Sequence, residues 1–219
     1  MTRDLRQELS HVYWIGGSPC SGKSRIADLF ANRHALRIYH WDEAFNEHQK
    51  RITPLEQPTI YKLLRMTWDE MWMRPVDVLL REAILAYGEQ FEMALQDLLA
   101  LPKSPPILAE GTALLPSCVS PLLGSPRQAI WIVPTEAFQR ERYPLRGEWV
   151  QQILKQCERP DEALQNWMDR DAAYARWISR ETERLDLKLL CVDGTRTIAE
   201  TAAIAATHLR LGAPERDFE

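Results

Sequence analysis

Short apolar runs alternate with stretches of helical periodicity along this chain. The apolar runs are rich in β-branched and aromatic residues and have the length of buried strands. They occupy residues 11–15, 36–40, 107–109, 129–133 and 187–192. The stretches between them repeat apolar residues three and four positions apart, which predicts amphipathic helices. These helices are expected over residues 25–33, 75–98, 161–184 and 198–211. The alternation predicts an α/β protein with a parallel sheet.

Residues 43–105 separate the second predicted strand from the third and form an expected helical insertion. Within it, Trp68 and Trp72 are four residues apart and would share one face of a helix. One interpretation packs these tryptophans against the body of the protein. In the other, one of them or Tyr61 lines a pocket for a flat or apolar molecule. Arg74 is either a clamp for an anionic group or a solvated surface residue.

The composition fits one domain of ordinary globular character. The chain has 219 residues, of which 45% are hydrophobic and 26% are charged. Its net charge of −4, without a basic run, counts against broad nucleic-acid binding. The sequence has no long apolar span, no secretory leader and no C-x-x-C pair among its four cysteines. We therefore expect a cytoplasmic protein with reduced thiols and no membrane contact. Its scattered histidines do not predict a structural zinc site.

A glycine-rich motif, G-x-x-x-x-G-K-S, lies between the first strand and the first helix. Its glycines allow the backbone amides to turn inward around an anion, and the helix that follows directs its positive end to the same place. Lys23 would reach the β- and γ-phosphates of a nucleotide, and Ser24 would offer its hydroxyl to Mg²⁺. Cys20 is either a small residue that fills the loop or an oxidisable thiol. The expected phosphate-binding residues are Gly17, Ser18, Pro19, Cys20, Ser21, Gly22, Lys23 and Ser24.

Two acidic residues follow predicted strands. In an open parallel sheet, ligands lie beyond the carboxyl ends of the strands, so both carboxylates face the expected site. Asp42 is either a catalytic carboxylate or the cap of a helix that begins at Glu43. Glu110 either holds Mg²⁺ together with Ser24 or is an exposed residue at the end of its strand. Gly111 is expected to let the backbone approach a ligand closely.

The loop, and the Glu110–Gly111 pair after an apolar strand, resemble those of the P-loop kinases of small molecules. This group includes nucleoside and nucleotide kinases, gluconate and shikimate kinases, chloramphenicol phosphotransferase and the zeta toxins. The resemblance implies a three-layer P-loop fold whose five-stranded parallel sheet has the order 2-3-1-4-5. It also implies that residues 43–105 form a helical insertion on the acceptor side, that residues 140–170 form a lid, and that Asp42 lies near the acceptor.

The same resemblance suggests roles for several arginines. Arg140, Arg142 and Arg146 follow the fourth strand, where the lid of such kinases closes over the triphosphate; the alternative is a solvated helix face. Arg170 is a further candidate for stabilising the transition state, or it forms an intrahelical pair with a carboxylate. Arg196, in the turn D-G-T-R, either stacks on the purine or belongs to a plain glycine turn.

These features predict an ATP-dependent phosphotransferase that uses Mg²⁺ and transfers the γ-phosphoryl group to a hydroxyl or phosphate of a small acceptor. The acceptor could be a nucleoside, a sugar acid or an antibiotic. The alternative is a nucleotide-binding regulatory ATPase without a small-molecule acceptor. A kinase acting on nucleic-acid ends is a third class, disfavoured by the acidic net charge. The candidate catalytic residues are Lys23, Asp42, Arg140, Arg142, Arg146 and Arg170.

Overall fold

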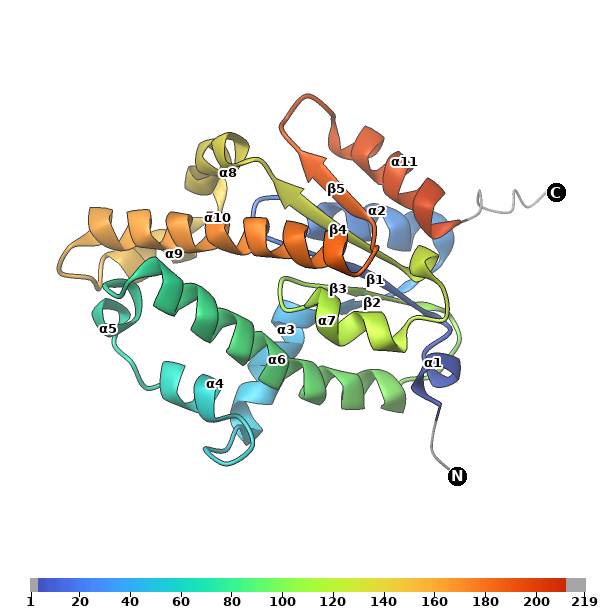
Figure 1. The fold of residues 1–219 in the computed structure, drawn as a ribbon, viewed down its shortest axis with the longest axis horizontal. Helices are drawn as coiled ribbons and strands as arrows, with labels where there is room; N and C mark the ends of the chain where they lie inside the picture. Colours follow the sequence, from blue (N-terminus) through green and yellow to red (C-terminus); the bar gives the residue numbers. More distant parts are fainter. Residues whose placement is uncertain (1–3, 212–219) are drawn as a thin grey trace.

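The computed structural model describes residues 4–211 and contains one five-stranded sheet, in which every neighbouring pair of strands is parallel (Figure 1). The strand order is β2-β3-β1-β4-β5. The strands are β1 (Val12–Gly17), β2 (Arg37–His40), β3 (Ile107–Glu110), β4 (Ala129–Pro134) and β5 (Leu189–Val192). The predicted α/β class, the parallel sheet and the order 2-3-1-4-5 are all confirmed, and the arrangement is consistent with a P-loop fold.

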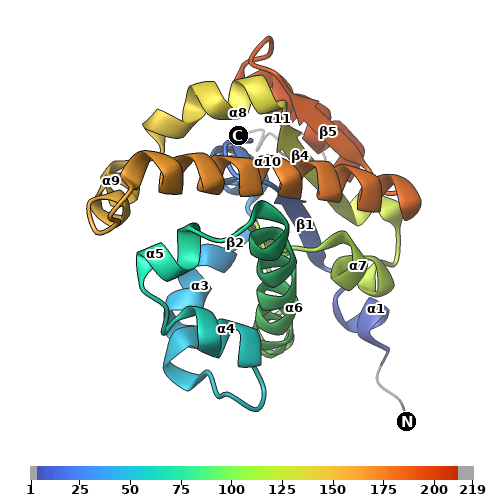
Figure 2. The ribbon, with the colours of Figure 1, turned by 60° about the vertical axis from the view of Figure 1, so that its left-hand side comes forward.

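Helices cover both faces of the sheet (Figures 1 and 2). One apolar cluster includes Ile15 and Ile132 with residues of α2 (Lys23–His34) and α11 (Ile198–Leu209). The other includes Trp14 and Trp131, which alternate with those isoleucines along the strands, and its helical residues come mainly from three other helices. These helices are α6 (Val76–Ala100), α7 (Pro116–Val119) and α10 (Pro160–Arg184). Because side chains of a strand alternate between faces, β1 and β4 are buried on both sides, as their apolar sequences predicted.

The end of β1 requires glycine because β4 lies so close to it. β1 extends two residues beyond its predicted end, and Gly16 and Gly17 pair in register with Trp131 and Ile132. A Cβ atom on Gly16 would lie 2.3 Å from the indole nitrogen of Trp131, which donates a hydrogen bond to the Leu114 carbonyl. Gly17 has φ +131°, and a Cβ there would lie 1.9 Å from the Ile132 carbonyl oxygen. The chain therefore leaves the sheet through two positions that tolerate no side chain.

The insertion between β2 and β3 is helical, as predicted, and ends in the 25-residue α6. The elements before α6 are α3 (Trp41–His48), η1 (Gln49–Arg51), α4 (Pro58–Leu63) and α5 (Trp68–Trp72), and Figure 2 shows the α-helices grouped on one side of the molecule. His48 Nε2 lies 2.7 Å from Asp97 Oδ2, which ties the end of α3 to α6. Trp72 stacks on Trp167 of α10 with ring centroids 4.2 Å apart, so this tryptophan packs the insertion against the body.

The segment after β4 folds into several short helices before the long α10. These are α8 (Glu136–Arg142), η4 (Tyr143–Leu145) and α9 (Glu148–Leu154). The long α10 begins at Pro160, one residue before the predicted start of the helix, and Arg159 occupies its N-cap position. The final helix ends at Leu209, because Arg210 adopts a left-handed conformation with φ +52°. The remaining helices are α1 (Leu5–Glu8), η2 (Ser120–Leu122) and η3 (Pro126–Gln128).

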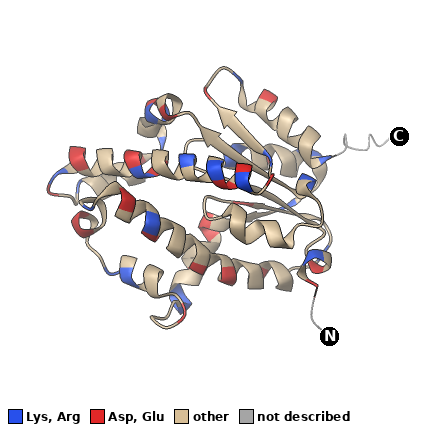
Figure 3. Ribbon diagram, viewed as in Figure 1, with Lys and Arg blue, Asp and Glu red and all other residues tan. Residues whose placement is uncertain are grey.

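Charged residues occupy the helices more than the sheet. Figure 3 shows mostly acidic residues along α6, whose one basic residue is Arg81, and both Arg and acidic residues along α10. Among the helices within residues 4–211, none has both the length and the apolar character needed to cross a bilayer.

Candidate functional site

The glycine-rich loop connects the end of β1 to the start of α2. Gly22 occupies the N-cap position with φ +82°, and α2 begins at Lys23. The Lys23 side chain turns back over the loop and donates a 2.8 Å hydrogen bond from Nζ to the Ser18 carbonyl. Lys23 is only 6% exposed, and this burial lowers the pKa of its ammonium group, while the nearby carboxylates of Glu110 and Asp42 oppose the shift. A buried cation at a helix N-terminus is an arrangement suited to binding an anion.

A cavity of about 200 Å³ opens in front of this helix; we call it the loop cavity. It brings the loop together with residues that are far away in the sequence. It is lined by Pro19, Cys20, Ser21, Gly22, Lys23, Ser24, Arg25, Asp42, Glu110, Thr112 and Arg146. The predicted loop, the two predicted carboxylates and one of the three predicted lid arginines thus meet at the carboxyl ends of the strands, where ligands of open parallel sheets lie.

Glu110 is buried beside the loop and has two polar neighbours. The Ser24 hydroxyl donates a 3.0 Å hydrogen bond to its Oε1, and His40 Nδ1 lies 3.4 Å from its Oε2. Glu110 is 5% exposed, so the alternative of an exposed glutamate at the strand end is wrong. His40 was not predicted as part of the site. It ends β2, and the register of β2 with β3 pairs it directly with Glu110.

The Ser24 and Glu110 oxygens are hard ligands of the kind that Mg²⁺ prefers. Within residues 4–211, no group of three or more His, Cys, Asp or Glu side chains is arranged to hold a metal ion. A magnesium ion here would therefore take its remaining ligands from water and from a bound phosphate, which is its usual coordination in nucleotide sites.

The position of Asp42 depends on the glycine that follows Glu110. A Cβ atom on Gly111 would lie 2.3 Å from the Cβ of Trp41, so Gly111 makes room for this buried tryptophan. The expected close approach of its backbone to a ligand stays a prediction. The next residue, Asp42, is exposed in the first turn of α3. The alternative that Asp42 caps the helix is also wrong, because His40 occupies the N-cap position. Asp42 has no hydrogen-bond or ion-pair partner among residues 4–211.

A second cavity of about 520 Å³, the β5-side cavity, adjoins the first. The two share Cys20, Ser21, Gly22, Arg25 and Arg146. Its other lining residues come from α8, from η4 and from β5 and α11 with the turn between them; they are Phe138, Arg142, Leu145, Val192, Gly194, Thr195, Arg196, Thr197, Ile198 and Thr201.

The turn that carries Arg196 is both a glycine turn and a wall of this cavity. Gly194 has φ +89° and packs against Phe138, and Asp193 Oδ1 accepts hydrogen bonds from the amide and the hydroxyl of Thr195. The Arg142 guanidinium carbon lies 4.9 Å from the centre of the Phe138 ring, and both residues line the cavity. Arginine and phenylalanine side chains at the wall of a cavity can both stack on a flat ring.

The predicted arginines separate into different environments. Arg140 forms ion pairs with Glu136 (2.8 Å) and Asp169 (2.6 Å) and lines neither of these cavities. Arg142 lines only the β5-side cavity, whereas Arg146 lines both. Arg170 forms a 2.7 Å ion pair with Asp171, its neighbour on α10, as the alternative interpretation expected.

Asp171 is a buried carboxylate that holds two of these arginines. Its side chain is 2% exposed. Tyr143 donates a 2.7 Å hydrogen bond to Oδ2, Arg146 Nη1 lies 3.4 Å from the same oxygen, and Arg170 Nε lies 2.7 Å from Oδ1. Burial raises the pKa of the Tyr143 hydroxyl, and the charge of Asp171 raises it further. The sequence showed only the neighbour Arg170, because Tyr143 and Arg146 reach Asp171 through the packing of η4 on α10.

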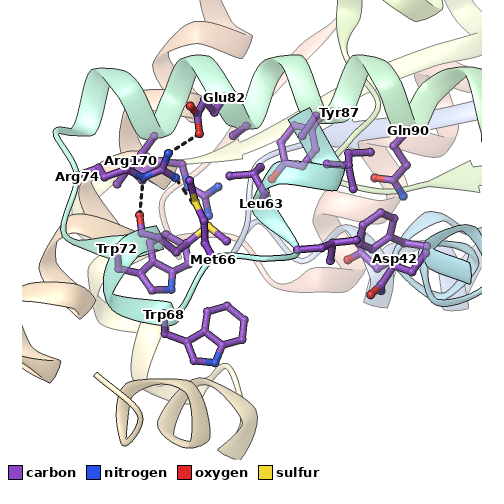
Figure 4. Close-up of a pocket in the computed structure, with 18 residues that line it drawn as sticks. Asp42, Leu63, Met66, Trp68, Trp72, Arg74, Glu82, Tyr87, Gln90 and Arg170 are labelled. Carbon is purple, nitrogen blue, oxygen red and sulfur yellow. Dashed lines mark hydrogen bonds and ion pairs between the residues drawn. The ribbon is translucent and has the colours of Figure 1, made fainter. Parts of the chain in front are cut away.

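A third cavity, the insertion cavity, lies among α3, α4, α5, α6 and α10 and has a volume of about 530 Å³ (Figure 4). All of its lining residues except Arg170 come from residues 42–90. They are Asp42, Phe45, Gln49, Ile60, Leu63, Leu64, Met66, Trp68, Met71, Trp72, Arg74, Leu79, Glu82, Ala83, Ala86, Tyr87, Gln90 and Arg170. Trp72 packs on α10, as the first interpretation of the tryptophans expected. Trp68 and Trp72 also line this cavity, whereas Tyr61 does not, and the flat or apolar occupant of the second interpretation stays a prediction. Asp42 alone, among the described residues, lines both this cavity and the loop cavity.

No protein-family model matches the chain, and no curated protein matches it either. The fold and the geometry of the three cavities are therefore the basis on which a function can be assigned.

Proposed function

We propose that the protein is a P-loop kinase that transfers the γ-phosphoryl group of ATP to a small-molecule acceptor. The observation that carries this proposal is the position of Asp42. Its carboxylate has no hydrogen-bond or ion-pair partner among residues 4–211, and Asp42 lines both the loop cavity, suited to phosphates, and the insertion cavity, suited to an organic molecule. Two cavities that share one carboxylate would bring two bound substrates to the same residue, which supports transfer between them.

The loop cavity would hold the triphosphate. The amides at the start of α2 and the Lys23 ammonium supply positive charge to the phosphates. Ser24 and Glu110 would hold Mg²⁺, which neutralises charge that builds up on the phosphate oxygens during transfer. The base would lie in the β5-side cavity between Arg142, Phe138 and Arg196.

Asp42 would orient the acceptor hydroxyl and accept its proton, as a carboxylate in hydrogen-bond reach of an attacking group can. Of the lid arginines, Arg146 is best placed to stabilise the transferring group, because it lines both nucleotide cavities. Arg140 is engaged by Glu136 and Asp169 on the outer side of the lid. The four free cysteines support a reducing compartment such as the cytoplasm.

The test compares Asp42→Asn with Glu43→Gln, a neighbouring exposed carboxylate that lines none of the three cavities. Candidate alcohols are screened for ADP release in a coupled assay, and ATP affinity is measured by calorimetry. Asp42→Asn should lower acceptor-dependent transfer by about 10²–10⁴-fold, the usual contribution of a general base, with ATP affinity unchanged. Glu43→Gln should leave both unchanged, and Lys23→Ala should abolish ATP binding.

Full transfer activity in Asp42→Asn would remove this residue from the mechanism. ATP hydrolysis that proceeds at the same rate with and without every acceptor tested would favour the alternative, a regulatory ATPase. Unchanged ATP affinity in Lys23→Ala would refute the nucleotide site itself.

A further inference from the structure

The insertion cavity is apolar over most of its wall. Twelve of its 18 lining residues are aliphatic, aromatic or Met side chains: Phe45, Ile60, Leu63, Leu64, Met66, Trp68, Met71, Trp72, Leu79, Ala83, Ala86 and Tyr87. A cavity of about 530 Å³ with few polar groups is of the size and character that bind drug-sized organic molecules. An occupant that fills it gains free energy by removing these apolar surfaces and its own from water.

The charged side chains that line the insertion cavity have a net charge of zero. They comprise two carboxylates, Asp42 and Glu82, and two guanidinium groups, Arg74 and Arg170. Arg74 donates a short hydrogen bond to Glu82, and its Nε donates to the Met71 carbonyl at 3.1 Å. Both guanidinium groups are therefore already paired with carboxylates, Arg170 with Asp171 behind the wall.

The polar groups occupy the ends of the insertion cavity. Figure 4 shows Asp42 and Gln90 at one end, and Arg74, Glu82 and Trp72 at the other, with Leu63 between them. The end with Asp42 is the end that meets the loop cavity. A reacting hydroxyl would thus lie beside Asp42 while the rest of the molecule extends over apolar wall towards the two tryptophans.

From this distribution we infer that the acceptor is an uncharged alcohol with a largely apolar, partly aromatic body, an assignment that rests on the proposed function. A sugar acid or a nucleoside monophosphate would bring a negative charge into a cavity whose cations are paired and whose reactive end is itself a carboxylate. Enclosing a charge without a partner is costly, so such anions are excluded. The sequence alone had left a nucleoside, a sugar acid and an antibiotic as possible acceptors.

A matched pair of probes tests the charge preference. The two probes, 2-(2-naphthyl)ethanol and naphthylacetate (the anion of 2-naphthaleneacetic acid), share a ring system, but the first carries a hydroxyl and the second a carboxylate. Both are titrated into the full chain with ADP and Mg²⁺, and binding is followed by calorimetry. The alcohol should bind at least about tenfold more tightly than the carboxylate, because burying one polar group without a hydrogen-bond partner costs at least that factor in affinity. In the coupled assay, gluconate and adenosine monophosphate should stimulate no ADP release.

Two variants locate the binding. Ala83→Trp fills the insertion cavity and should abolish binding of the alcohol, whereas Leu85→Trp, on the exposed face of the same helix, should not. Leu63→Lys places a cation in the wall and should reverse the preference towards naphthylacetate, a gain that a folding defect cannot produce.

Equal affinity for the two probes overturns the inference, as does Lys23-dependent phosphorylation of gluconate or adenosine monophosphate. Absence of binding by the alcohol, in a protein that still binds ATP, overturns it as well. In each of these cases ATP binding persists, so the proposed kinase function is judged separately, by the Asp42 and Lys23 variants.

Discussion

Replacing the buried Asp171 by alanine should destabilise the protein strongly. The substitution leaves Arg146 and Arg170, which are 21% and 14% exposed, without the carboxylate that they share, and leaves Tyr143 without its acceptor. Removing one partner of a buried ion pair costs about 3–5 kcal/mol. Both arginines retain some contact with water, which favours the lower figure, about 3 kcal/mol. For a chain of this size that loss lowers Tm by about 6–12 °C.

Thermal unfolding followed by circular dichroism measures the loss, with Asp169→Ala as the matched control. Asp169 lies on the same helix and pairs with Arg140 at 2.6 Å, but both side chains of this pair are about one-third exposed. Such a pair contributes only about 0–1 kcal/mol, so Tm should fall by no more than about 4 °C. Equal losses in the two variants would refute the view that Asp171 is the electrostatic centre that holds Tyr143, Arg146 and Arg170 together.

Three further predictions concern other positions. Gly88→Ala should raise Tm, because no heavy atom lies within 4 Å of the new Cβ in α6 and alanine stabilises a helix by about 0.5–1 kcal/mol over glycine; an unchanged Tm would contradict this. Gly111→Ala should shift Trp41, seen as an altered near-ultraviolet circular dichroism signal, whereas an unaltered spectrum would show that Trp41 does not depend on this glycine. Burial acts to raise the pKa of Glu82, but hydrogen bonds from its two basic partners outweigh burial and hold the pKa below 4.5. The unfolded chain therefore binds more protons in acid, and stability falls as pH drops through about 4.5. Glu82→Gln should flatten this decline in urea unfolding between about pH 5 and pH 3, and an equally steep decline would assign the acid sensitivity to other groups.

The sheet could be predicted because each of its strands can be recognised from a few consecutive residues. Strands β1, β3 and β4 are short apolar runs, and the crossover helix between β1 and β2 shows its own periodicity. The positions of Asp42 and Glu110 followed from the rule that ligands lie at the carboxyl ends of parallel strands. Both residues do line the loop cavity, as that rule predicted.

The rest depends on contacts between segments that are distant in the sequence. His40 meets Glu110 only because β2 pairs with β3 in that register, and Gly111 faces Trp41 only because α3 starts beside β3. The role of Asp171 depends on how η4 packs on α10. A carboxylate on an amphipathic helix gives no sign of which distant side chains will reach it, so periodicity predicted the helix but not the network.

The walls of the three cavities come from different stretches of the chain. Apart from Arg170, the insertion cavity is built from residues 42–90, while the other two cavities take only Asp42 from that stretch. Mutations in α4, α5 and the first half of α6 can therefore change the shape of the insertion cavity without changing the glycine-rich loop. Substitutions within this one segment could therefore let related chains bind different molecules in the insertion cavity, while Asp42 is kept because it also lines the loop cavity.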